Sequence, residues 1–229
     1  MPWLALLFVS AGIVVTIVRT VLSLRRVHAL QTWARTHGWR FTPGPDPTVG
    51  RTYLELGLIG NGLVQATNLA SGLWQGRQIH VFDLDRRRRP GSRDGVQGLF
   101  TCVVVKADMP LIPLRIRPEI TADRLASALG FNDIDFESAA FSAAFHVSSP
   151  DRKWAYDVLP PRQIEFLLGR PRWWLELGGW WCLIAVPGGL AAERIPEAIA
   201  TATGFLAGIP PHARRDVLGP ELAGQRRQR

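Results

Sequence analysis

The first 24 residues form an apolar run that constrains this chain more than any other stretch. Residues 2–18 carry no charged side chain, Arg19 interrupts the run, and residues 20–24 are again uncharged. A helix rises about 1.5 Å per residue, so roughly 20 apolar residues cross a hydrocarbon core about 30 Å thick. The run therefore predicts one N-terminal transmembrane helix. The residues expected to anchor it are Trp3, Leu4, Leu7, Phe8, Ile13, Val14, Ile17 and Val18.

Two other interpretations of this run are weaker. A cleaved signal peptide needs a basic region before its apolar stretch and a small-residue cleavage site after it. Here no Lys or Arg precedes the run, and the sequence TVLSLRR follows it. A buried core helix would not usually need so continuous an apolar run at the very start of the chain. The membrane anchor is the favoured interpretation.

The charges that flank the run predict its orientation. Arg19, Arg25, Arg26 and Arg35 all lie on its C-terminal side, and no basic residue lies on its N-terminal side. The positive-inside rule then places the N-terminus outside the cell and the rest of the chain in the cytoplasm. We therefore expect a single-pass protein of the bacterial inner membrane.

The remainder is long enough for one domain with a sizeable core. We expect a juxtamembrane helix and linker over 25–48, a globular domain over 49–218 and a disordered basic tail over 219–229. The PGPDP segment at 43–47 motivates the linker, since proline and glycine interrupt regular structure. Cys102 and Cys182 each lie in an apolar run, which favours small buried side chains over a disulfide or a metal pair.

The pattern within the domain predicts an α+β fold. Segments 64–69, 77–85, 99–107 and 112–117 are rich in Val, Ile, Phe and Thr, and short turn-like sequences separate them. Short connections favour an antiparallel sheet, because parallel strands need a long crossover. Helical spacing dominates afterwards, so we expect helices packed on that sheet.

A hairpin is expected over 173–186. Gly178 and Gly179 match the two-residue turn that strand twist prefers. That register places Trp173, Leu175 and Leu177 on one face, while Trp174 and Glu176 lie on the other.

Two clusters of charge are candidate sites. Arg86, Arg87, Arg88 and Arg89 could contact phosphates of anionic lipid headgroups, although a solvated loop is the favoured interpretation. Nucleic acid is the least favoured partner, because no aromatic residue is interleaved to stack on bases.

The acidic alternation of Asp133, Asp135 and Glu137 is the second cluster. In an extended segment the three carboxylates share a face and could hold Mg²⁺ or Ca²⁺. Capping of the neighbouring helices is the favoured use, since acids are stabilised at helix N-termini. The histidines have no metal-ligand spacing, and no nucleotide-binding or nucleophile-elbow motif occurs, so we expect no cofactor.

Three segments carry a resemblance to a known family. They are GRQIHVFDLD at 76–85, PLIPLRIRPE at 110–119 and the stretch from Asp133 to Leu168. In these segments the chain resembles an uncharacterised actinobacterial family of membrane-anchored proteins. The resemblance spans about 62–210 and is a pattern of structural residues. It implies a membrane-anchored domain and no known activity.

These features favour a non-enzymatic function. We expect a cytoplasmic binding or scaffold domain at the inner membrane, in contact with membrane lipids and a protein partner not yet known. The alternative is a membrane-tethered, metal-dependent enzyme that uses the acidic cluster.

Overall fold

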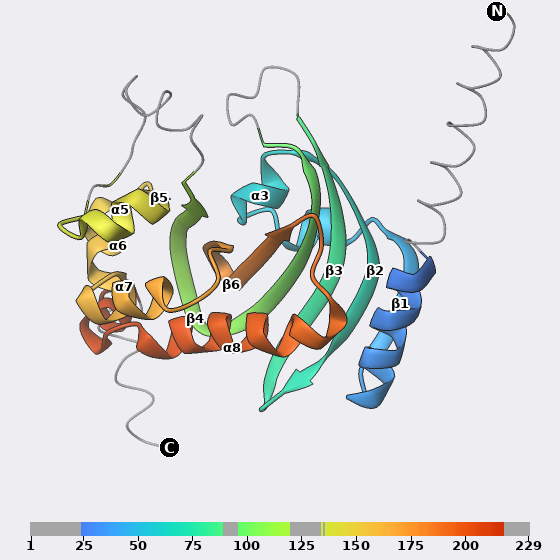
Figure 1. The fold of residues 1–229 in the computed structure, drawn as a ribbon. Helices are drawn as coiled ribbons and strands as arrows, with labels where there is room; N and C mark the ends of the chain where they lie inside the picture. Colours follow the sequence, from blue (N-terminus) through green and yellow to red (C-terminus); the bar gives the residue numbers. More distant parts are fainter. Residues whose placement is uncertain (1–23, 89–95, 120–133, 135, 218–229) are drawn as a thin grey trace, which may run out of the picture.

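The computed structural model of the chain describes residues 24–88, 96–119, 134 and 136–217. A strongly curved antiparallel sheet forms its centre, with helices on both faces (Figure 1). This agrees with the predicted α+β class. The strands are β1 Arg40–Asp46, β2 Leu63–Trp74, β3 Arg77–Arg87, β4 Gly98–Pro118, β5 Phe145–Ser148 and β6 Trp174–Pro187.

The helices fall into three groups. Residues 24–36 are helical before β1, and residues 211–217 are helical near the end of the described chain. The short helices α2 Val49–Thr52 and α3 Gly57–Gly60 lie between β1 and β2. The remaining helical segments follow β4 and are α5 Ala139–Ala144, α6 Arg152–Val158, α7 Pro161–Leu168, η1 Ala192–Arg194 and α8 Ile195–Gly208.

The sheet is a meander with one long central strand. β1 to β5 pair in chain order, and β6 pairs with the other edge of β4. β4 has 21 residues, so its first half pairs with β3 and its end with β5. Gln75 and Gly76, with φ of 51° and 78°, join β2 to β3 in the primed turn that suits strand twist.

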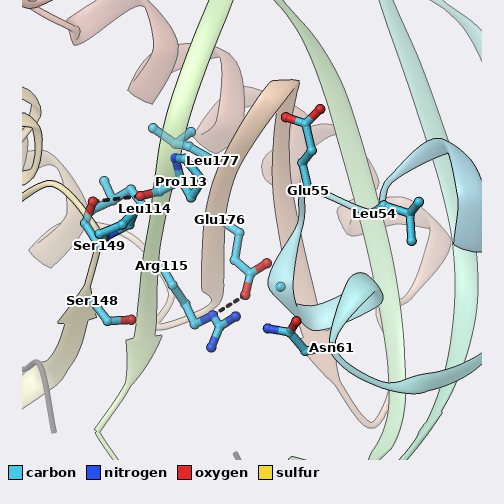
Figure 2. A pocket seen from close by; sticks show the side chains of 12 residues that line it. Leu54, Glu55, Asn61, Pro113, Leu114, Arg115, Ser148, Ser149, Glu176 and Leu177 are labelled. Carbon is cyan, nitrogen blue, oxygen red and sulfur yellow. Dashed lines mark hydrogen bonds and ion pairs between the residues drawn. The ribbon is translucent and has the colours of Figure 1, made fainter.

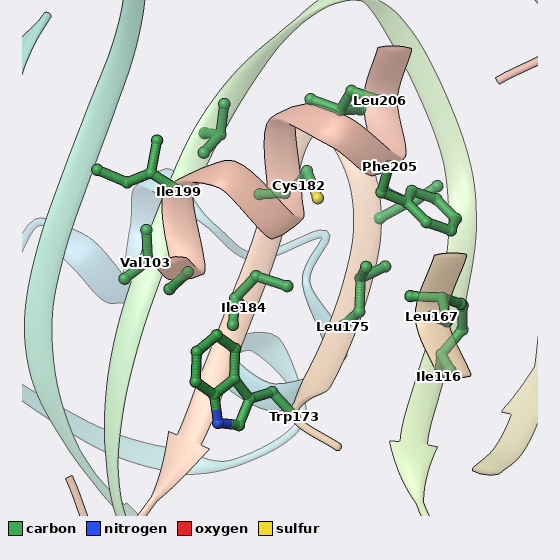
Figure 3. Packing of buried hydrophobic residues seen from close by; sticks show 14 of the residues in the cluster. Val103, Ile116, Leu167, Trp173, Leu175, Cys182, Ile184, Ile199, Phe205 and Leu206 are labelled. Carbon is green, nitrogen blue, oxygen red and sulfur yellow. The ribbon is translucent and has the colours of Figure 1, made fainter. Parts of the chain in front are cut away.

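The core has two parts, one on each face of the sheet. Alternation along β4 directs Val103 and Val105 to one face and Cys102 and Val104 to the other. The larger part lies under α7 and α8, where Phe205 packs toward the sheet (Figure 3). The smaller part is closed by the segment that holds α2 and α3.

The prediction of a hairpin over 173–186 is wrong. The segment is one continuous strand, β6, paired along its length with β4. Gly178 and Gly179 lie inside it because Glu55 crosses there. A Cβ at Gly178 would be 2.5 Å from the Glu55 carbonyl oxygen, and a Cβ at Gly179 would be 2.4 Å from its carboxylate. The glycines thus permit a close approach of two segments.

Two expected interruptions of the sheet are also corrected. The segment 43–47 does not act as a linker, since β1 runs to Asp46 with a register shift between Thr42 and Pro45. β4 continues through Met109 and Pro110, where its register with β6 shifts. A bulge accommodates proline because the extra residue does not donate to the ladder.

Residues 24–48 share the core of the rest of the domain. Leu30 and Ala34 are fully buried, and Trp33 lies 4.9 Å from Trp39 between ring centroids. Trp33 also stacks against Trp74 of β2. The first helix and first strand therefore belong to the folded unit, with no separate juxtamembrane piece before residue 49.

Capping residues set the helix boundaries after β4. The Asp151 carboxylate accepts a hydrogen bond from the Trp154 amide at 3.0 Å, and Ser138 caps α5 in the same way. Pro161 begins α7, where its missing N–H has no cost.

The expected anchor and tail lie almost wholly outside the described residues. The anchor shares only Leu24 with them, and the tail over 219–229 shares none. Across the described ranges, no helix is both long and apolar enough to cross a membrane.

Candidate functional site

The arginine run does not form one exposed surface. Arg86 is 1% exposed, and its Nε donates to the Leu58 carbonyl oxygen at 2.7 Å. Its Nη1 donates to the Val96 carbonyl oxygen, so this arginine joins the segment before β2 to the loop before β4. Arg87 is exposed and lies 3.5 Å from Asp85, whereas Arg89 lies outside the described residues.

Strand alternation could have identified Arg86 as buried. Phe82 and Leu84 precede it at a spacing of two, and both are fully buried. Successive side chains of a strand point to opposite faces, so Arg86 shares their face. Because Arg86 is followed by three more arginines, the run shows no alternation of polar and apolar residues and is interpreted as one exposed loop.

The acidic cluster is mostly outside the described part of the chain. Asp133 and Asp135 belong to the undescribed residues, and Glu137 is exposed immediately before the cap of α5. Within the described ranges, no group of three His, Cys, Asp or Glu side chains is placed to hold a metal ion. The metal site stays a prediction.

The two cysteines lie on opposite faces of the sheet and are free. Burial raises the pKa of both thiols, which keeps them protonated. The prediction that they are small buried side chains is confirmed.

A pocket of about 340 Å³ lies where β4, β5 and β6 meet the segment around α3 (Figure 2). None of its charged residues was selected from the sequence as a site residue. It is lined by Leu54, Glu55, Gly57, Asn61, Pro113, Leu114, Arg115, Ser148, Ser149, Pro150, Glu176 and Leu177.

A buried ion pair forms the polar wall of this pocket. Arg115 Nε donates to Glu176 Oε1 at 2.6 Å, and the side chains are 26% and 1% exposed. Glu176 also accepts hydrogen bonds from Trp174 Nε1 at 2.8 Å and from the Leu58 amide at 3.0 Å. A buried carboxylate needs such partners to offset its lost hydration. Glu176 therefore joins β4, β6 and the start of α3 around one charge.

The sequence carries one signal for this pair. Glu176 is the only charged residue between Trp173 and Val186, a run otherwise apolar or glycine. A lone acid in such a run requires a partner once the strand is buried on both faces. Its partner, Arg115, is 61 positions away and follows only from the pairing of β4 with β6.

A second polar network joins the N-terminal helical segment to the sheet. Arg26 Nη2 donates to Asp83 Oδ1 at 2.9 Å and to Thr101 Oγ1 at 2.8 Å. Its Nη1 donates to the Leu190 carbonyl oxygen. Asn68 Nδ2 donates to the second oxygen of Asp83 at 3.2 Å. One arginine thus holds the residues that follow the expected anchor to β3, β4 and the loop after β6.

A third cluster surrounds His80. Its Nδ1 contacts the Tyr53 hydroxyl, and its Nε2 lies 3.0 Å from Gln78 Nε2. Burial lowers the pKa of His80 and raises the pKa of Tyr53. Both groups are therefore neutral near pH 7, and this cluster is a satisfied polar contact within an aromatic layer that includes Trp181.

The comparisons with known proteins indicate a class of fold. No family model matches the chain, and no curated protein matches it. Among solved structures, the chain is similar to the crystal structure of the mycobacterial trehalose monomycolate transport factor A, TtfA. The TM-score is 0.57 at 15% sequence identity, and the match covers 81% of this chain and 97% of that one.

This likeness concerns the fold, since the sequences share 15% of their residues. It extends over nearly the whole TtfA chain, which makes the shared architecture more than a common sheet motif. The solved protein is actinobacterial, as the sequence resemblance predicts. Membership of the membrane-anchored family stays a prediction, because no family model matches.

Proposed function

We propose that this chain is a membrane-tethered, non-enzymatic binding module that serves as an accessory factor to lipid transport at the inner membrane. Its folded part would lie on the cytoplasmic side, as the flanking arginines predict. The class of role comes from TtfA, which is named as a transport factor. Neither the transported lipid nor the partner is transferred from it.

The Arg26 network is the observation that carries this proposal. A flexible tether would need no partly buried arginine two residues beyond the anchor. Here Arg26 and Asp83 are 22% and 23% exposed, and besides each other they have three hydrogen-bond partners, which are Leu190, Thr101 and Asn68. Charge-assisted hydrogen bonds of this kind are stronger than neutral ones. The network supports a domain held in one pose against the bilayer, as a scaffold requires.

The pocket face supplies a surface for a partner. Leu54 lines the pocket and is 61% exposed, and Trp180, which follows the glycines of β6, is 48% exposed. Exposed large apolar side chains of this kind are typical of binding surfaces, and tryptophan is enriched at their centres. We assign the protein-binding role to the surface around these two side chains.

Membrane tethering is tested first. The full chain and a chain starting at residue 25 are expressed in a bacterium and extracted with alkaline carbonate. The full chain is expected to stay in the membrane pellet, and the shorter chain to be released. A C-terminal reporter that is active only in the cytoplasm should be active. A reporter active only outside would overturn the orientation.

The binding role is tested by photo-crosslinking in intact membranes. A photoreactive residue replaces Leu54 or Trp180, and the control replaces the exposed Arg162 on α7. We expect positions 54 and 180 to crosslink to an integral membrane protein and position 162 not to. Equal adducts at all three positions, or none, would contradict the assignment of this face.

A further inference from the structure

The guanidinium of Arg115 has donors that the protein does not use. Glu176 accepts only from Nε. Among the described residues, no hydrogen bond reaches either Nη atom, although the side chain borders the pocket and is 26% exposed. An arginine presents two Nη groups in a planar fork that matches the two oxygens of an oxyanion. The fork is therefore available to a ligand in the pocket.

Two further donors lie beside this fork. Figure 2 shows the Ser148 hydroxyl and the Asn61 amide directed toward the guanidinium from opposite sides. Ser148 ends β5, Arg115 lies on β4 and Asn61 follows α3, so three separate segments bring these groups together. No protein partner within the described chain accepts from either side chain. Convergent, unpaired donors of this kind favour an anion.

Gly57 provides the space that this arrangement needs. A Cβ at that position would be 1.6 Å from Nη2 of Arg115. Any other residue would push the guanidinium out of its place. The backbone of α3 therefore forms one side of the cradle in which the fork lies.

The charges near the fork limit the ligand to one negative charge. Glu176 already offsets the positive charge of Arg115. Glu55 also lines the pocket, and its carboxylate points away from the guanidinium (Figure 2). A doubly charged phosphate would meet one free fork and two carboxylates, whereas a carboxylate or phosphodiester would be matched by the fork and its neutral donors.

The rest of the lining includes three apolar side chains that belong to this side of the sheet, Leu54, Pro113 and Pro150. Leu114 and Leu177 alternate with Arg115 and Glu176, so their side chains belong to the larger core part on the other face of the sheet. The volume of about 340 Å³ suits a headgroup with a short apolar segment, at the lower end of ligand pockets. A polar fork beside exposed apolar side chains is typical of a site for an amphipathic molecule.

We propose that this pocket binds a singly charged oxyanion that carries an apolar chain, with the Arg115 fork, Asn61 and Ser148 holding the anionic group. Two sources share this chemistry, a free carboxylate with an aliphatic tail and the phosphodiester of a lipid headgroup. The inference deepens the proposed binding role and rests on it only in treating this face as the functional one.

The test is calorimetric titration of the full chain in phosphatidylcholine nanodiscs. The probes are hexanoate, dihexanoyl phosphatidylglycerol and inorganic phosphate, each with empty nanodiscs as reference. Binding of hexanoate or the phosphatidylglycerol is expected, with inorganic phosphate at least about tenfold weaker. Preference between the two amphipathic probes identifies the source. If inorganic phosphate bound as tightly as the amphipathic probes, the proposal that the ligand carries an apolar chain would be overturned.

The decisive variant is Asn61→Ala with Ser148→Ala, which keeps the Arg115–Glu176 pair and so the fold. This double variant is expected to bind the preferred probe about tenfold more weakly or worse, since two hydrogen bonds to a charged group are lost. Arg115→Gln should abolish binding, and Arg162→Gln should leave it unchanged. Unchanged affinity in the double variant, or no binding of any probe to the parent chain, would overturn the site. Crosslinking at position 54 or 180 without binding of any probe would contradict the proposed ligand of the pocket. The proposed protein-binding role would then still stand.

Discussion

At the scale of single residues, buried charges decide which contacts this fold cannot lose. Glu176 is 1% exposed and is surrounded by Arg115, Trp174 and the Leu58 amide. Arg86 is equally buried and makes its contacts to backbone carbonyl oxygens. In both cases one charge ties together segments that are distant in sequence.

Removal of the cation beside Glu176 should therefore be costly. Arg115→Met leaves a buried carboxylate without its ion pair, and the free energy of unfolding should fall by about 3 kcal/mol. Urea denaturation of the full chain in detergent measures the change. The matched Arg162→Met, on the exposed face of α7, should stay within about 0.5 kcal/mol. Similar losses in both variants would contradict the role of burial.

His80 gives the chain a predicted pH dependence. Burial lowers its pKa in the folded state, so the unfolded chain binds a proton at higher pH than the folded chain does. The free energy of unfolding should then decrease as the pH falls through about 6.5, with a slope of at most about 1.4 kcal/mol per pH unit. Asp46, whose pKa is lowered mainly by Thr48, loses its contribution only at lower pH.

Thermal denaturation between pH 7.5 and 5.5 tests this dependence. His80→Gln should lose most of it, because glutamine does not titrate. His212→Gln, at an exposed position, is the control and should retain it. A parent chain with flat stability over this range would rule out the titration of His80.

At the scale of elements, β4 and β6 determine how the molecule is built. Their long pairing carries both parts of the core and positions both members of the pocket ion pair. Its register shifts between Lys106 and Leu111, where the strands accommodate Pro110. The glycines of β6 lie in the same region and give Glu55 room to cross.

Gly178→Ala tests this close approach. The new Cβ would be 2.5 Å from the Glu55 carbonyl oxygen, a backbone atom that cannot rotate away. Overpacking of this kind should lower the free energy of unfolding by about 1–3 kcal/mol. Gly169→Ala is the matched control, since its Cβ would meet nothing nearer than 3.5 Å. Equal stability of the two variants would argue for a simple turn at position 178.

At the scale of the whole molecule, the first helical segment and the sheet form one unit. Trp33 of this segment stacks against Trp74 of β2, and Arg26 of the same segment binds Asp83 on β3. Any force on the expected anchor would therefore pass directly to the sheet. This coupling is the physical basis of the proposed scaffold.

A double-mutant cycle measures that coupling. Arg26→Gln and Asp83→Asn should each destabilise the chain, and their effects should be non-additive by about 1–2 kcal/mol. Arg26→Gln should also speed proteolysis near the start of the domain. The cycle of Arg194→Gln with Glu197→Gln, an exposed pair, serves as control and should couple by less than about 0.5 kcal/mol. Additive effects of the Arg26 and Asp83 substitutions would show that the two residues are not coupled, and would contradict the proposed role of this network.

The class of fold could be predicted from local patterns, and the helix ends also depend on local signals. Asp151, Pro161 and the pattern of apolar strands act within a few residues, so their effect is readable without tertiary contacts. The prediction of a hairpin at Gly178 was wrong because a pair of glycines is compatible with two different structures. It can reverse the chain, or it can admit another segment, and only the position of Glu55 distinguishes them.

The sequence by itself determined the antiparallel α+β class and the buried cysteines. It also predicts the membrane anchor, which lies almost wholly outside the described residues. Only the tertiary structure decided that Arg86 is buried, that Arg26 joins the first helical segment to the sheet, and that Arg115 and Glu176 form the wall of a pocket. The reason is physical. Caps and strand alternation depend on neighbours in the chain, whereas a buried charge depends on partners brought together by the sheet.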